Sequence, residues 1–77
     1  KTLFPYTTLF RSHQQKRDYI DGIVRLAEEA GARDPEQLGQ QLAVLYEGAA
    51  ALATSLDDPA PWVYARRAAE ALLDAQS

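Results

Sequence analysis

Few side chains in this chain could take part in chemistry, and they stand apart from one another. Asp57 and Asp58 form a carboxylate pair that could act as general acid and base, and Arg66 and Arg67 could hold a phosphate group. His13 is the single histidine and has no obvious partner near it in the sequence. Because these positions do not form a catalytic or ligand set, the sequence predicts no enzyme, no metal site and no cofactor.

Each charged candidate also has a structural interpretation. The aspartate pair directly precedes a proline, a pattern typical of a helix start, so Asp58 is expected to cap a helix. The arginine pair fits a solvated helix face with Glu70 as partner. Glu47 is the one charge between Leu42 and Ala53. It either points outward at the edge of a helical bundle or pairs across a dimer.

Length and composition limit the possible classes of protein. The 77 residues allow one small domain, and the chain has no cysteine for a disulfide or a thiolate metal site. We find no apolar run long enough to span a bilayer and no signal-peptide pattern, so the expected setting is the cytoplasm, without a membrane. Residues 13–77 carry six basic and eleven acidic residues, a net charge of −5. An acidic module of this size is not expected to hold nucleic acid by itself.

The first twelve residues differ from the rest. They contain no acidic residue, and LFPYTTLF is strand-like but interrupted by Pro5, with no downstream segment to pair with it. The stretch TLFPYTTLFRS at 2–12 resembles, at every position, the translation of a widely used short-read sequencing adapter. We therefore expect residues 1–12 to be a disordered, non-native leader and residues 13–77 to be a biological fragment that begins in mid-gene. The adapter does not explain Lys1.

Three helices are expected after this leader. The first covers about 14–30, where Gly31 is placed to end it in a left-handed conformation. Gly22 in its middle either faces solvent or marks the close approach of a neighbouring helix. Its apolar positions recur at helical spacing: Tyr19, Ile20, Ile23, Val24, Leu26, Ala27 and Ala30.

The second helix has a strong start signal in RDPEQL. Asp34 is the expected N-cap, Pro35 fits the first helical position, and Gln37 completes an arrangement like a capping box. We expect this helix to continue to about Leu56.

The second helix is apolar on more than one side. One row of residues steps by four and three: Leu38, Leu42, Leu45, Ala49 and Leu52. A neighbouring row is formed by Val44, Gly48, Ala51 and Ser55. One partner helix could not cover both rows, so a further partner is expected, and a two-fold dimer is the commonest way to supply it.

The third helix is expected to begin after the N-cap Asp58, with Pro59 at its first position. Its apolar face comprises Trp62, Ala65, Ala68, Ala69, Leu72 and Ala75. The connection to the second helix is short, so these two helices must lie antiparallel as neighbours. The expected fold is therefore all-α, with three helices.

The order of four motifs resembles the C-terminal end of TetR/AcrR-type transcriptional repressors. They are EAGA at 29–32, DPEQL at 34–38, QLAVLYEGA at 41–49 and ARRAAEALL at 65–73. The resemblance extends over about residues 19–75. It implies that the last two helices pack on the same pair of a second subunit as a four-helix bundle, so that the hairpin forms half of that bundle.

The expected dimer interface follows from this arrangement and from the apolar rows: Leu42, Leu45, Gly48, Ala49, Ala51, Leu52, Ala65, Ala69 and Leu72. In that family a separate N-terminal domain binds DNA and a larger helical domain binds a small effector. The resemblance therefore implies that DNA and effector are partners only of the missing part of a parent protein. Tyr19 and Ile23 could approach an effector pocket there, but core packing is the alternative, and Tyr46 and Trp62 are expected to be packing residues.

Two other classes of function compete with this one. A fragment of a helical interaction scaffold without a regulatory role would require a repeat at fixed period, and the second and third helices share none that we find. A fragment of a helical enzyme would require convergent polar groups on a buried face, whereas the faces expected to be buried are apolar.

Overall fold

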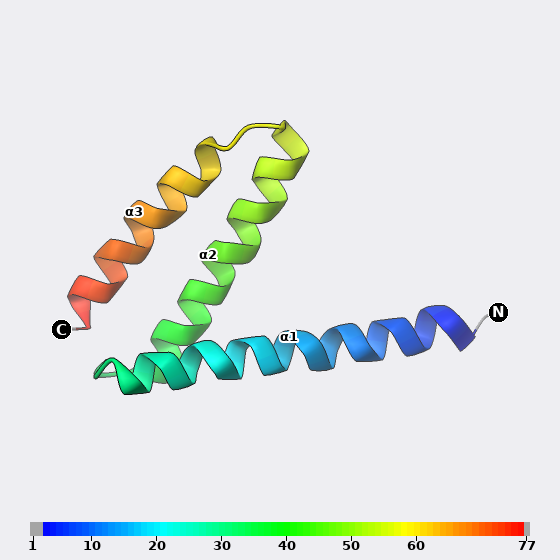
Figure 1. Ribbon diagram of the computed structural model, residues 1–77, viewed down its shortest axis with the longest axis horizontal. Helices are drawn as coiled ribbons and strands as arrows, with labels where there is room; N and C mark the ends of the chain where they lie inside the picture. The colour runs from blue at the N-terminus through cyan, green and yellow to red at the C-terminus, as the bar shows by residue number, and fades with distance from the viewer. Residues whose placement is uncertain (1–2, 77) are drawn as a thin grey trace.

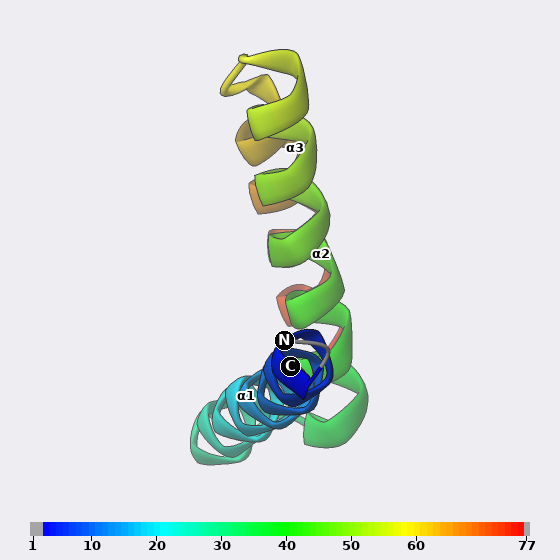
Figure 2. The same ribbon diagram turned by 90° about the vertical axis from the view of Figure 1, so that its right-hand side faces the viewer.

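Three helices make up the computed structural model, which describes the backbone of residues 3–76 and the burial of side chains 13–76. They are α1 (Leu3–Glu29), α2 (Pro35–Leu56) and α3 (Ala60–Ala75), and the described residues include no strand. The fold is therefore all-α, as the sequence predicts. α2 and α3 form an antiparallel hairpin, and α1 crosses α2 near the start of α2 (Figure 1, Figure 2). Within the described residues, α1 and α3 each pack on α2 but not on each other.

The first helix is longer than the sequence predicts. It begins at Leu3 rather than near residue 14, so residues 3–12 are helical where a disordered tail was expected. Pro5 lies in the first turn, where its missing N–H breaks no intrahelical hydrogen bond, and no further proline or glycine interrupts the helix before Gly22. This N-terminal half projects beyond α2 (Figure 1). Lys1 and Thr2 lie outside the described residues.

The turn between α1 and α2 is built as the sequence predicts at Gly31, which has a φ of 84°. Gly31 N donates to Glu28 O at 3.0 Å and Ala32 N donates to Ala27 O at 3.0 Å, the bond pattern of a Schellman motif. Asp34 then caps α2, because its Oδ1 accepts from Gln37 N at 3.1 Å. The predicted capping box is only half formed.

The turn between α2 and α3 differs by one residue from the prediction. Asp57 takes the left-handed conformation with a φ of 52°, and Asp58 N donates to Ala53 O at 3.0 Å. The helix begins at Ala60, so its N-cap residue is Pro59 rather than Asp58, and Pro59 already has helical backbone angles (φ −77°, ψ −5°). Asp58 still serves the first turn, since its Oδ1 accepts from Ala60 N at 2.9 Å.

The buried core of the described side chains is small. Leu38 is its one large member, 1% exposed, and α3 contributes no buried residue. α1 meets α2 at Gly39, which is also buried, whereas nothing lies within 4 Å of a Cβ built at Gly22. Of the two interpretations of Gly22, the open position is therefore the correct one. The buried apolar side chains are Ala27, Leu38, Ala43 and Ala49.

Candidate interaction surface

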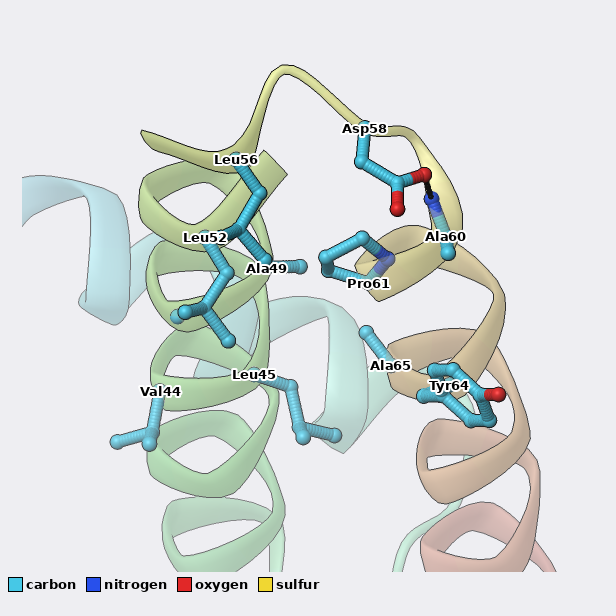
Figure 3. A pocket seen from close by; sticks show the side chains of 11 residues that line it. Val44, Leu45, Ala49, Leu52, Leu56, Asp58, Ala60, Pro61, Tyr64 and Ala65 are labelled. Carbon is cyan, nitrogen blue, oxygen red and sulfur yellow. Dashed lines mark hydrogen bonds between the residues drawn. The ribbon is translucent and has the colours of Figure 1, made fainter. Parts of the chain in front are cut away.

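An open apolar groove runs between α2 and α3 on the face of the hairpin that turns away from α1. Figure 3 shows this groove, with α1 behind the hairpin. The groove has a volume of about 500 Å³, and Asp58 is the one charged residue among those that line it. Its walls are formed by Val44, Leu45, Gly48, Ala49, Leu52 and Leu56 of α2, and by Asp58, Ala60, Pro61, Tyr64 and Ala65 at and after the second turn.

Large apolar side chains border the groove without being covered. Val44 is 69% exposed, Leu52 54%, Leu56 63% and Tyr64 66%. Burying a side chain of this kind stabilises a complex by roughly 25 cal/mol for each Å² removed from water. A contiguous apolar strip of this kind is typical of an interaction site.

The apolar strip continues toward the C-terminus of α3. A second hollow of about 350 Å³ is lined by Gln40, Gln41, Val44, Leu45 and Leu72. Val44 and Leu45 border both hollows. We call the two together the hairpin groove.

The hairpin groove brings together most of the predicted interface, namely Leu45, Gly48, Ala49, Leu52, Ala65 and Leu72. Three predicted members lie elsewhere. Leu42 and Ala69 are half-buried away from the groove lining, and Ala51 is exposed outside it. The reason is the helical step: Ala51 is turned about 100° from Leu52, which takes it off the groove.

Other lining residues were not predicted as interface. Leu56 stands four residues after Leu52, and Tyr64 stands three after Pro61, so helical spacing could have placed them on the same side. Val44 was recognised only as a member of the neighbouring row of α2.

Three aromatic rings connect the helices on another side of α2. The ring centroids of Tyr19 and Tyr46 are 5.8 Å apart, and those of Tyr46 and Trp62 are 5.3 Å apart, both pairs tilted. Tyr19 belongs to α1, Tyr46 to α2 and Trp62 to α3, so this aromatic row holds all three together. Burial is the main cause that raises the pKa of Tyr19 above its usual value of 10.0; the nearby Tyr46 and Glu47 raise it further, and Lys16 opposes them.

The charged candidates have local partners. Glu47 pairs with Lys16 of α1, with Nζ and Oε1 2.8 Å apart and both side chains about half exposed (59% and 50%). Its partner therefore lies within the chain. Arg66 Nε lies 3.4 Å from Glu70 Oε2 on a solvated face, the arrangement expected for it. Exposed pairs such as these contribute about 0–1 kcal/mol each.

The remaining candidates do not form a chemical centre. His13 is exposed on α1. Asp57 is the C-cap residue of α2, and its backbone N–H donates to carbonyl groups in the last turn of that helix. Arg67 lies over the ring of Tyr64, 5.9 Å from its centroid. Among the residues that the structure describes, no cluster of histidine and carboxylate side chains could hold a metal ion.

None of the helices, over their described residues, combines the length and the apolar character needed to cross a bilayer. Comparison with models of protein families, with curated proteins and with solved structures found no match to this chain.

Proposed function

We propose that this chain is the self-association part of the C-terminal domain of a TetR/AcrR-type transcriptional regulator. In this proposal the α2–α3 hairpin packs on the same hairpin of a second copy, and the two form a four-helix bundle. The observation that supports it most is the hairpin groove, an uncovered apolar surface bordered by exposed Val44, Leu52, Leu56 and Tyr64.

Charge favours a second copy at this surface. The chain is acidic, with a net charge of −3, so two copies repel each other over most of their surfaces. The lining of the hairpin groove carries one charged residue, Asp58. Like-charged copies therefore meet with least repulsion at this face, and a two-fold axis lets each copy cover the apolar strip of the other.

The role proposed for the chain is binding rather than catalysis. Recognition of DNA and of a small effector would belong to other parts of the parent protein, which would act in the cytoplasm. The support for this regulatory setting is the resemblance of the motifs at 29–32, 34–38, 41–49 and 65–73. The genomic reading frame of the source tests it, since a regulator of this type must also encode a helix-turn-helix segment.

A helical scaffold fragment without a regulatory role is the second candidate. The same hairpin groove would then receive an apolar helix of a different protein rather than a second copy. The exposed, nearly uncharged strip suits an apolar helix of another protein as well as it suits a second copy of this chain. Self-association of the purified chain separates the two candidates.

The sharpest test places one carboxylate inside the hairpin groove and another outside it. Val44 lines the groove and is 69% exposed, whereas Val63 is 48% exposed and lines none of the described groove. Each is replaced by glutamate, and dimer dissociation constants are measured by sedimentation equilibrium. We expect Val44→Glu to weaken the dimer by roughly 30-fold or more, because a carboxylate must then be taken out of water into an apolar interface. Val63→Glu should change it by less than about threefold.

Two results would contradict the proposal. The unsubstituted chain could stay monomeric at every concentration, which would remove the self-association role. Alternatively, Val63→Glu could disrupt the dimer while Val44→Glu leaves it intact, which would place the interface on another face of the hairpin.

A further inference from the structure

Two hydrogen bonds fasten the end of α3 to the turn between α1 and α2. Arg33 Nη2 donates to Ala75 O at 2.7 Å, and Asp34 N donates to Gln76 Oε1 at 2.7 Å. The partners are 42 residues apart in the sequence. Figure 1 shows the C-terminus of α3 returning to this turn. We call this pair of bonds the clasp.

The clasp is well suited to hold a helix terminus. The last carbonyl groups of a helix have no intrahelical donor and carry the negative end of the helix dipole. Arg33 supplies both a donor and a positive charge to Ala75 O. Gln76 occupies the N–H of Asp34, the group that Gln37 would have bonded in a full capping box.

The rest of the contact between α3 and α2 is thin. α3 has no buried residue, and the residues that turn toward α2 are mostly alanines. Its start is tied covalently by the short turn at residues 57–59. Its end has no such tie, and within the described residues α3 does not pack on α1. The clasp is therefore a second tie for α3, at the opposite end of the helix from the turn.

The clasp lies near one end of the hairpin groove. Leu72 forms the α3 wall there and Leu45 the α2 wall, and Ala75 stands three residues beyond Leu72. A displacement of the last turn of α3 changes the distance between these walls. The turn at residues 30–34, which carries Arg33, also joins α1 to α2.

We propose that the clasp is a conformational device that sets the opening of the hairpin groove, so that self-association depends on Arg33 and Gln76. The part that concerns self-association rests on the proposed function. The part that concerns the groove opening does not, because it is a property of one chain. A change at the α1–α2 turn would loosen the dimer without touching its interface.

The first measurement follows the groove within one chain. The chain has no cysteine, so Gln37→Cys and Ala71→Cys, both at exposed positions of α2 and α3, give two unique sites for spin labels. The distance between the labels is measured by electron paramagnetic resonance in samples diluted with unlabelled chain. We expect Arg33→Ala to broaden this distance distribution and shift it to longer values. Arg33→Lys, which keeps the positive charge and a hydrogen-bond donor group, should restore part of the unsubstituted distribution.

The second measurement is the dimer dissociation constant of the same variants without labels. Arg33→Ala and Gln76→Ala should each weaken the dimer by roughly three- to tenfold, the range that corresponds to a helix-terminus interaction. Arg25→Ala is the matched control, since Arg25 is exposed on α1 and forms no described hydrogen bond or ion pair. It should change the constant by less than about twofold.

The results separate this inference from the proposed function. An unchanged label distance in Arg33→Ala overturns the clasp, whatever the oligomeric state. A longer distance with an unchanged dimer constant overturns its link to self-association. An unsubstituted chain that never dimerises refutes the proposed function and with it that link, while the label distance still decides whether the clasp sets the groove.

Discussion

Gly39 of α2 lies against the backbone of Val24 in α1. A Cβ built at Gly39 would be 2.9 Å from the Cα of Val24 and 3.0 Å from its backbone nitrogen. Both neighbours are main-chain atoms, which cannot turn aside as a side chain would. The two helices therefore cross at a point where only glycine fits.

Gly39→Ala is expected to destabilise the fold by about 1–3 kcal/mol, because the added methyl must push the helices apart. The gain in helix propensity, about 1 kcal/mol, offsets part of this cost. Gly22→Ala is the matched control, since its Cβ would meet nothing within 4 Å. The free energy of unfolding of Gly22→Ala should be higher than that of the unsubstituted chain by about 0.5–1 kcal/mol. Urea unfolding followed by circular dichroism measures both, and a stabilised Gly39→Ala would show that the crossing is looser than described.

Asp34→Ala is expected to lower the free energy of unfolding by about 1 kcal/mol, since the Oδ1 that accepts from Gln37 N is lost. Asp34→Ser keeps an acceptor at this position and should recover most of the loss. Asp21→Ala, at an exposed position of α1, is the control for removing one negative charge. Equal losses from Asp34→Ala and Asp21→Ala in thermal unfolding would mean that the cap has no special role.

The raised pKa of Tyr19 predicts a loss of stability in alkaline solution. The unfolded chain releases this proton near the usual value of 10.0, before the folded chain does. The folded state then binds more protons than the unfolded state, so the free energy of unfolding falls as the pH rises from about 10 through the pKa of folded Tyr19.

Tyr19→Phe removes this ionisation. Urea unfolding of both chains from about pH 9 to about pH 11 should therefore show a steeper decline for the unsubstituted chain. Parallel curves would mean that Tyr19 ionises equally in both states.

Removing residues 1–12 is expected to change the free energy of unfolding by less than about 0.5 kcal/mol, because this part of α1 projects beyond α2 (Figure 1). The measurement is urea unfolding of residues 13–77 against the whole chain. A loss above about 1 kcal/mol would show that the segment supports the fold.

The interpretation of residues 2–12 as a translated adapter stays a prediction. Sequencing the source DNA with a different library adapter tests it, because a natural segment would be read again unchanged. A different sequence at these positions would bear the interpretation out.

The sequence by itself determined the helices and most of their ends. Apolar residues at helical spacing, the left-handed position of Gly31 and the cap at Asp34 all depend on neighbours within about five residues, so local patterns contain them. For the same reason the sequence showed that α2 has too much apolar perimeter for one partner helix. The start of α1 was misjudged because strand-like composition in residues 3–12 is a weak preference, and helix continuation overrode it.

Only the tertiary structure decided which of these faces meet. The sequence pattern singled out Gly22 and Gly48 but not Gly39, whereas among the four glycines only Gly39 lies where α1 and α2 cross. The clasp joins residues 42 apart, and no local pattern specifies such a bond. Glu47 forms its ion pair with Lys16 of α1 in the same chain, not with a residue of a second copy. These contacts depend on the angles between helices, which are set by the summed packing of many side chains and not by the spacing of any few.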